Sequence, residues 1–209
     1  MSQTPAIRVA DTPEALSDIH LPDCAAAIWP REPLHSFQVW INSLEPRLLP
    51  KARTILRPDR VHDAASAICD VCGTPDSAER ALLIGDIAAL ADIFASLMDT
   101  SYLMMRLDVV TSHSCRKFHS DASSGRLICT YRGTGTQYGI SKDGADPGQV
   151  FTAPTCAPIL LRGSRSLRSS GPSLLHRSPP IETTDETRLV LVLDPVDGAD
   201  APPNRNNLN

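Results

Sequence analysis

The feature that most constrains the fold of this chain is a change of pattern near residue 100. Over 11–100, apolar residues recur at helical spacing, for example Leu83, Ile87, Leu90, Phe94 and Leu97. After that, short apolar runs are separated by Gly, Pro, Ser and Asp, which is typical of strands and turns. The runs are Leu103–Val110, Arg126–Tyr131, Gln149–Ala153, Ile159–Arg162, Ser173–His176 and Arg188–Leu193. Strands without intervening helices predict an antiparallel sandwich or jelly roll.

The length of the chain predicts one domain, because 209 residues divided between two cores would leave each of them small. We expect an α+β domain whose N-terminal helices pack on a C-terminal jelly roll. Its parts are a flexible N-terminus (1–12), a helical part (13–100), a strand-rich core (101–194) and a disordered tail (195–209). Within the helical part, Thr74-Pro75-Asp76 supplies a cap, a first-turn proline and an early acid, which predict a helix over Pro75–Met98.

Composition excludes several classes of protein. A net charge of −4 argues against nucleic-acid binding, and the basic stretch Arg162–Arg168 is short. The first residues lack the basic and apolar regions of a signal peptide, and no stretch approaches the length of a membrane span. We therefore expect a cytoplasmic protein that does not contact a membrane, and we expect its 6 cysteines to be reduced.

Three residues of the strand-rich half have the chemistry of a metal site. His119 and Asp121 form a His-x-Asp pair, and residues two apart on a strand project from the same face. His176 is the only histidine that follows them, and it lies on another predicted strand. Two histidines and one carboxylate form the triad that holds non-haem Fe(II) and leaves coordination positions open.

Arg188 adds a cation to this set. A hairpin centred on Glu182 would place Arg188 opposite His176, with both side chains on one face. A guanidinium there matches the distal carboxylate of a 2-oxo acid such as 2-oxoglutarate. The alternative for Arg188 is an ion pair at a strand edge with Glu182 or Asp185.

The order of these motifs resembles that of the Fe(II)- and 2-oxoglutarate-dependent oxygenase superfamily, whose fold is a double-stranded β-helix. The resemblance covers roughly Leu103 to Asp194 and implies that Fe(II) and 2-oxoglutarate are the cofactors. It implies that the metal ligands are His119, Asp121 and His176. It also implies that Arg188 anchors 2-oxoglutarate and that the pocket is lined by Tyr131, Arg132, Thr136 and Tyr138.

A second resemblance extends over nearly the whole chain. The sequences that carry it are Cys115–Asp121, Arg126–Thr136, His176–Pro180 and Arg188–Asp194. They are similar to those of a bacterial family catalogued as a domain of unknown function (number 1826). The two resemblances together imply an oxygenase that hydroxylates a small molecule or a side chain, with the loop Gly139–Gly148 as the candidate lid. The sequence determines neither the substrate nor the oligomeric state.

Other interpretations stay open. The same triad fits a non-enzymatic, cupin-like protein that handles zinc or iron, and a degenerate scaffold used for protein contacts is a third hypothesis. His119 and Asp121 would then be solvated residues of a surface strand. Cys69 and Cys72 form a C-x-x-C pair that one helical face could share with His62, but no second pair completes a zinc site. We expect these cysteines to be helix thiols.

Overall fold

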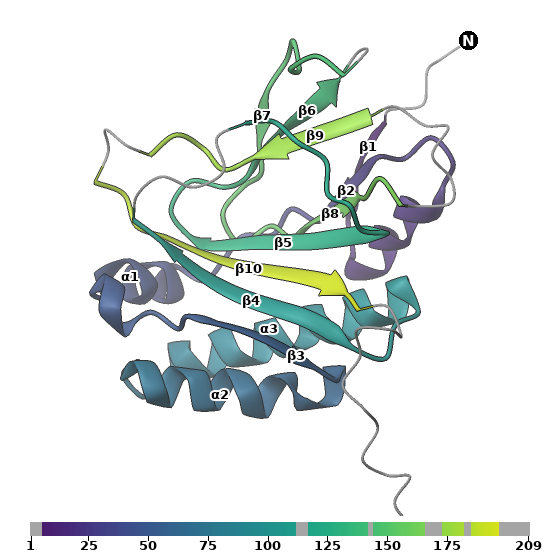
Figure 1. Ribbon diagram of the computed structural model, residues 1–209. Helices are drawn as coiled ribbons and strands as arrows, with labels where there is room; N and C mark the ends of the chain where they lie inside the picture. Colours follow the sequence, from purple (N-terminus) through teal and green to yellow (C-terminus); the bar gives the residue numbers. More distant parts are fainter. Residues whose placement is uncertain (1–5, 112–116, 142–143, 166–172, 182–184, 197–209) are drawn as a thin grey trace, which may run out of the picture.

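The computed structural model describes residues 6–111, 117–141, 144–165, 173–181 and 185–196, which form two β-sheets and several helices (Figure 1). The larger sheet has the strand order β1-β2-β8-β5-β10-β4-β3 and the smaller has the order β7-β6-β9. The larger sheet contains β1 (Ile7–Val9), β2 (Ala26–Ile28), β8 (Ile159–Arg162), β5 (Gly125–Arg132), β10 (Arg188–Pro195), β4 (Leu103–Val110) and β3 (Ala52–Leu56). The smaller contains β7 (Phe151–Thr152), β6 (Gln137–Ser141) and β9 (Ser173–Arg177).

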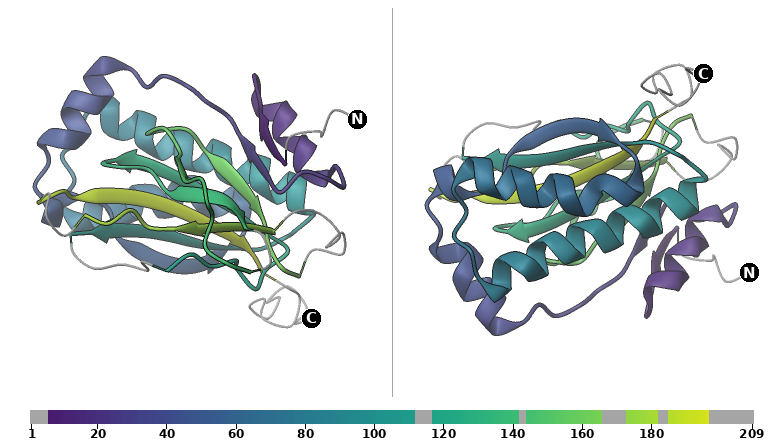
Figure 2. Two further views of the ribbon diagram at one scale, coloured as in Figure 1. Left: turned by 90° about the horizontal axis from the view of Figure 1, so that it is seen from above. Right: turned by 90° about the horizontal axis from the view of Figure 1, so that it is seen from below.

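The helices lie on the face of the larger sheet that is turned away from the smaller one. They are α1 (His35–Ser43), α2 (Val61–Cys72) and α3 (Ala78–Met98), and α2 and α3 run side by side (Figure 2). Three short 3₁₀ helices complete this part: Pro13–His20, Pro46–Leu48 and Pro58–Arg60.

The longest helix, α3, begins later than the sequence predicted. The Ser77 hydroxyl accepts a hydrogen bond from the backbone N–H of Arg80 at 3.1 Å, so Ser77 is the cap. Thr74 does not cap the helix, because its hydroxyl donates to the carbonyl oxygen of Leu48 at 2.6 Å. The helix ends at Asp99, whose φ of 48° is left-handed.

The length of α3 corrects the expectation that no stretch approaches a membrane span. By length and composition, α3 is the one helix in the described ranges that could cross a membrane. However, Leu83, Ile87 and Phe94 are fully buried in the main hydrophobic cluster, which also contains residues of the larger sheet. Packing against that sheet accounts for the apolar sequence, since a core helix meets the same criteria.

Strand β10 lies at the centre of the larger sheet and separates two hydrophobic clusters. It pairs antiparallel with β4 on one side and with β5 on the other. Leu189, Leu191 and Leu193 belong to the main cluster on the helix side. Val190 and Val192 belong to a second cluster, which also contains residues of β6 and β9 from the smaller sheet. The two sheets therefore face each other across the second cluster.

Several sequence-based expectations differ from the observed elements. Strands β4 and β8 have the predicted bounds, but β6 was not predicted, and β2 and β3 lie in the part expected to be helical. Residues 7–9 of the expected flexible N-terminus form β1. The predicted hairpin between β9 and β10 is wrong, because β9 pairs with β6 in the other sheet. Residues 1–5 and 197–209, which hold most of the expected flexible ends, lie outside the described residues.

Candidate metal centre

The backbone brings His119 and His176 together. The N–H of His119 donates to the carbonyl oxygen of His176 at 3.1 Å, and the reverse bond measures 2.9 Å. This reciprocal exchange defines a hydrogen-bonded antiparallel pair, in which the two side chains project on the same side. The two imidazole rings accordingly lie 4.5 Å apart between centroids.

Asp121 completes a three-residue cluster. Its Oδ2 lies 3.2 Å from Nε2 of His176, and its Oδ1 lies 3.8 Å from Nε2 of His119. One potential ligand atom from each residue lies within 4.8 Å of the other two. Ligand atoms about 2.1 Å from one metal ion, on one face of it, lie about 3 Å from each other. The cluster is therefore close to the geometry that a metal ion requires.

One buried atom tests whether a cation fits among these side chains. Asp121 Oδ2 is buried and accepts no hydrogen bond within the part of the chain that the structure describes. A buried carboxylate oxygen without a donor is unfavourable, and a cation between it and the two Nε2 atoms would satisfy it. The Nδ1 of His119 lies 3.0 Å from the carbonyl oxygen of Lys117, which can only accept. Nδ1 therefore carries the proton, so the lone pair for binding a metal is on Nε2.

The electrostatics of the cluster keep His176 neutral. Burial, together with the smaller effects of the nearby His119 and Arg126, lowers the pKa of His176 to about 3. At neutral pH its imidazole is thus unprotonated, as metal binding requires. Burial also raises the pKa of Asp121, although Arg126 and His119 act against that rise.

Arg126 on β5 holds the carboxylate of Asp121 in place. Its Nη1 donates to Asp121 Oδ1, while Nε and Nη2 donate to the two carboxylate oxygens of Asp194 at 2.6 and 2.9 Å. The guanidinium therefore joins the end of β10 to the candidate metal centre. Arg126 was not among the predicted site residues, although strand alternation places it on the same face as Ile128, which lies between the two sheets.

The cluster lies beside a cavity between the two sheets, which we call the inter-sheet cavity. Its volume is about 370 Å³. Its described lining consists of Lys51, Arg106, Asp108, Val109, Val110, His119, Arg126, Ile128, Thr136, His176, Arg177, Ser178, Arg188, Val190 and Val192. The predicted residues His119, Thr136, His176 and Arg188 thus share one cavity, which Asp121 adjoins through Arg126.

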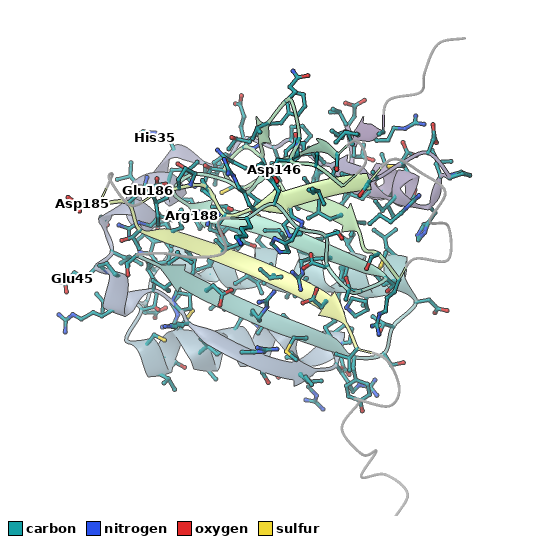
Figure 3. All side chains as sticks on the ribbon, turned by 45° about the horizontal axis from the view of Figure 1, so that its top comes forward. His35, Glu45, Asp146, Asp185, Glu186 and Arg188 are labelled. Carbon is teal, nitrogen blue, oxygen red and sulfur yellow. The ribbon has the colours of Figure 1, made fainter. Side chains whose placement is uncertain are left out.

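Arg188 projects from the first residue of β10 and is only 1% exposed (Figure 3). Its Nε donates to the carbonyl oxygen of Thr134 at 2.6 Å and its Nη1 to the hydroxyl of Ser178 at 3.3 Å. No carboxylate pairs with it among the described residues; Glu182 lies outside them. Burial lowers the pKa of Arg188 to about 10, against the opposing effect of Glu186. Its cross-strand partner is Val110 of β4 rather than His176, so the expected register is wrong even though both residues line the cavity.

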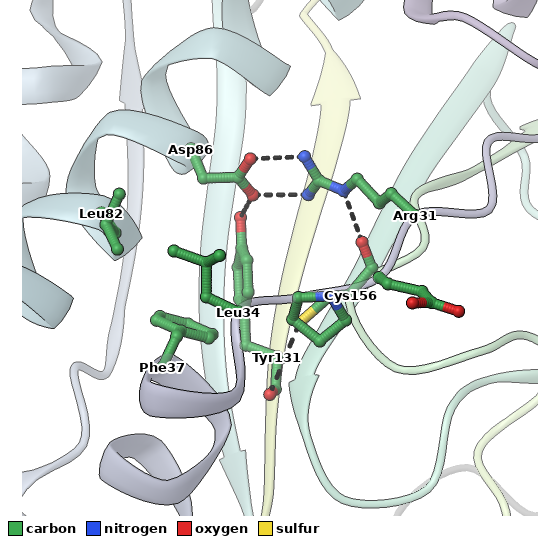
Figure 4. A pocket seen from close by; sticks show the side chains of 9 residues that line it. Arg31, Leu34, Phe37, Leu82, Asp86, Tyr131 and Cys156 are labelled. Carbon is green, nitrogen blue, oxygen red and sulfur yellow. Dashed lines mark hydrogen bonds and ion pairs between the residues drawn. The ribbon is translucent and has the colours of Figure 1, made fainter.

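Two residues predicted to bind the cosubstrate lie on the opposite face of the larger sheet. The Tyr131 hydroxyl donates to Asp86 of α3 at 2.7 Å, within a smaller pocket of about 180 Å³ (Figure 4). In that pocket Arg31 forms a two-bond ion pair with Asp86 at 2.5 and 2.6 Å. Arg132 donates to the carbonyl oxygens of Ile41 and Leu44 near the end of α1. Neither Tyr131 nor Arg132 lines the inter-sheet cavity.

The cysteines do not form a second candidate metal site in the described ranges. Cys69 is fully buried in α2 and belongs to the main hydrophobic cluster, whereas the side chain of His62 is 64% exposed. Cys115 lies outside the described residues. His119, Asp121 and His176 are the one group of three or more metal-ligating side chains found among the residues that the structure describes.

Comparison with known families gives a match over most of the chain. Residues 10–194 match the family described as "Protein of unknown function (DUF1826)". The chain belongs to the DUF1826 family. No curated protein matches this DUF1826 chain.

Solved structures extend the comparison. The dioxygenase for auxin oxidation 1 from Arabidopsis thaliana, in a binary complex with 2-oxoglutarate, is 10% identical, with a TM-score of 0.50 over 94% of the DUF1826 chain and 99% of its own. An oxidoreductase of the 2OG-Fe(II) oxygenase family from Burkholderia pseudomallei is 14% identical, with a TM-score of 0.47 over 92% and 95% of the two chains. At these identities, the first likeness shows the fold alone. That fold is the double-stranded β-helix of the auxin dioxygenase.

Proposed function

We propose that this DUF1826 protein is an Fe(II)- and 2-oxoglutarate-dependent oxygenase. The observation that carries the proposal is the convergence of two imidazoles and one carboxylate beside a cavity that also contains a buried arginine with no carboxylate partner among the described residues. The first group suits Fe(II), and the second suits the free carboxylate of a 2-oxo acid. The substrate, a small molecule or a protein side chain, and the cytoplasmic location stay predictions.

In this proposal His119, Asp121 and His176 hold the metal. Bound Fe(II), with 2-oxoglutarate and O₂, supplies the oxidising chemistry for a C–H bond of the substrate. The carbonyl of Lys117 orients the imidazole of His119, and burial keeps His176 unprotonated. Arg126 fixes the orientation of the Asp121 carboxylate through its Oδ1, and this leaves Oδ2 directed toward His176.

Arg188 would bind the distal carboxylate of 2-oxoglutarate. A buried guanidinium without a counterion is unfavourable, and a bound carboxylate compensates for the loss of hydration. Two of its nitrogens already contact Thr134 and Ser178, which fixes the plane of the group. The buried Thr136 also lines the cavity, and its hydroxyl is available to a bound anion.

The test is calorimetric titration of 2-oxoglutarate into anaerobic protein with and without Fe(II). We expect binding that requires Fe(II) and that decreases at least about tenfold in Arg188→Met, the loss of one charge-assisted contact. Arg57→Met is the matched control, because Arg57 is exposed, pairs with Asp59 and lies outside the cavity. Binding of 2-oxoglutarate that is independent of Fe(II) would contradict the proposal.

The same protein distinguishes the alternative function. A zinc- or iron-handling protein would retain Zn(II) tightly through His119, Asp121 and His176 and would bind no 2-oxo acid after reconstitution with iron. The unpaired Arg188 favours the oxygenase, since metal storage alone gives no reason to bury a cation in the cavity.

A further inference from the structure

The inter-sheet cavity contains more positive charge than one 2-oxoglutarate molecule requires. Its described lining includes one acid, Asp108, and five basic residues: Lys51, Arg106, Arg126, Arg177 and Arg188. Arg126 is neutralised by Asp121 and Asp194. Arg177 donates to Gln137 and lies over the ring of Phe118 at 4.3 Å. Arg106 and Lys51 therefore need a separate explanation.

Arg106 on β4 is poorly satisfied within the protein. Its nearest carboxylate is Asp194, whose Oδ2 lies 3.6 Å from Nη2 and already accepts a shorter bond from Arg126. Its Nε is buried and donates no hydrogen bond to any described residue. Much of the hydrogen-bonding capacity of this guanidinium is thus unused beside the cavity.

Lys51 lies at the edge of the larger sheet, where the register of β3 places it opposite Asp108 and pairs Arg53 with Arg106. It immediately precedes β3, the edge strand, and Ala52 pairs with Leu107, so Lys51 lies level with the segment that contains Arg106 and Asp108. Lys51 is exposed, and no described residue forms an ion pair or hydrogen bond with it. Asp108 can offset the charge of Lys51, whereas Arg106 shares the carboxylate of Asp194 with Arg126 and is the more distant of the two arginines.

The two ends of the cavity are distinct. Along β10, Arg188 and Val192 are four residues apart, about 13 Å in a strand, and Val192 is the cross-strand partner of Arg106. The head of Arg188 contacts Thr134 and Ser178, whereas the head of Arg106 lies toward Asp194. A carboxylate bound by Arg188 therefore leaves Arg106 free for a second ligand.

The side of the cavity along β4, where Arg106 lies, is less covered than the side along β10. On β10, the residues that face the smaller sheet, Val190 and Val192, are buried. Their cross-strand partners on β4, Asp108 and Arg106, are only half-buried. The three described strands of the smaller sheet thus cover β10 more completely than β4.

We propose that the substrate carries an anionic group, a carboxylate or phosphate, which Arg106 and Lys51 bind on the β4 side of the cavity. Walls of Ile128, Val190 and Val192 would contact an apolar part of the same molecule. That the bound anion is a substrate rests on the proposed oxygenase function. The anion site itself does not depend on bound metal.

The test uses benzoate and phenyl phosphate as anionic probes and benzamide as the neutral probe. Each is titrated into metal-free full-length protein, and binding is followed by NMR chemical shifts. We expect both anions to bind at least about tenfold more tightly than benzamide, and to lose about tenfold in Arg106→Gln, as expected for the loss of one charge-assisted contact. Arg106→Lys, which retains the charge, should lose less.

Two further variants assign the site. Lys51→Gln changes an exposed residue, so it should fold normally and still weaken binding of the anions severalfold. Arg57→Gln, which changes an exposed arginine outside the cavity, should leave anion binding unchanged. Equal binding of benzamide, undetectable binding of both anions, or anion affinity that persists in Arg106→Gln and Lys51→Gln would overturn the inference. Anion selectivity without any binding of 2-oxoglutarate to Fe(II)-loaded protein would instead refute only the oxygenase proposal.

Discussion

Replacing Arg188 with methionine should stabilise the metal-free protein while removing its affinity for 2-oxoglutarate. Methionine has a similar length and no charge, so it fills the volume of a side chain that is 1% exposed. Most removals of a buried charged group destabilise, because a partner charge is left behind. Arg188 has no carboxylate partner among the described residues, and this reverses the expected sign.

The size of the change in the free energy of unfolding follows from the lowered pKa of Arg188. Burial lowers the pKa of Arg188 from its usual value to about 10, which corresponds to a penalty of about 3 kcal/mol on the charged form in the folded state. Because the group is charged in both states at every pH below about 10, that penalty applies in full at pH 7. The variant also loses the bonds to Thr134 and Ser178, about 1 kcal/mol each. The net expectation is a gain of about 1 kcal/mol in the free energy of unfolding.

Urea denaturation of metal-free protein measures this change as a higher midpoint with an unchanged m-value. A chain of this size should gain roughly 2–4 °C in Tm for each kcal/mol. With Fe(II), 2-oxoglutarate at about 100 times its Kd should stabilise the unsubstituted protein by about 2.7 kcal/mol but give the variant little protection. A loss of about 2 kcal/mol or more in the metal-free variant would refute the reasoning, since it would mean that the protein satisfies the charge of Arg188 by itself.

Three other substitutions test the site. Tyr131→Phe removes the bond to Asp86 and should lower the free energy of unfolding by about 2 kcal/mol in urea titrations; weaker 2-oxoglutarate binding would contradict its place on the helix side. Because the folded-state pKa of His176 is about 3 and the unfolded value is 6.5, metal-free protein should lose stability as the pH falls from about 6.5 toward 3. The raised pKa of Asp121 changes stability with pH in the opposite sense. The unsubstituted protein is therefore compared with His176→Gln, which lacks only the imidazole. Identical dependence of stability on pH in the two proteins would count against a buried neutral imidazole. Asp121→Asn should weaken Co(II) binding, measured by absorption spectroscopy, by more than about 100-fold, and retained affinity would remove Asp121 from the ligand set.

The site was more predictable than the pairing of strands. His119 and Asp121 are two apart in an extended segment, so local geometry alone places them on one face. The prediction of a hairpin between β9 and β10 was wrong because it assumed that consecutive strands are neighbours in one sheet. Here the chain passes from the smaller sheet to the larger one between β9 and β10. Arg188 reaches the cavity by facing the smaller sheet from β10, a relation that sequence spacing does not encode.

The incorrect placements of Tyr131 and Arg132 have different causes. Tyr131 lies two residues after Cys129 and four after Leu127 along β5, and both of these face the helices. Because alternate residues of a strand face the same side, Tyr131 belongs to the main cluster as soon as the side that Leu127 and Cys129 face is known. Arg132 has the opposite parity, but the register of β5 against β10 shifts between the pairs Leu189–Arg132 and Val190–Thr130. Such a bulge redirects the residues beyond it, and no feature of the sequence marks its position.

Strand β10 gives this protein an unusual evolutionary constraint. Its leucines at 189, 191 and 193 belong to the main cluster, while the intervening residues Arg188, Val190 and Val192 line the cavity. Selection for folding and selection for ligand specificity therefore act on alternate positions of one short segment. An insertion or deletion of one residue there would exchange the two sets and disrupt both properties together. New ligand specificities should consequently arise by substitution at the even-numbered positions, with the length of β10 kept constant.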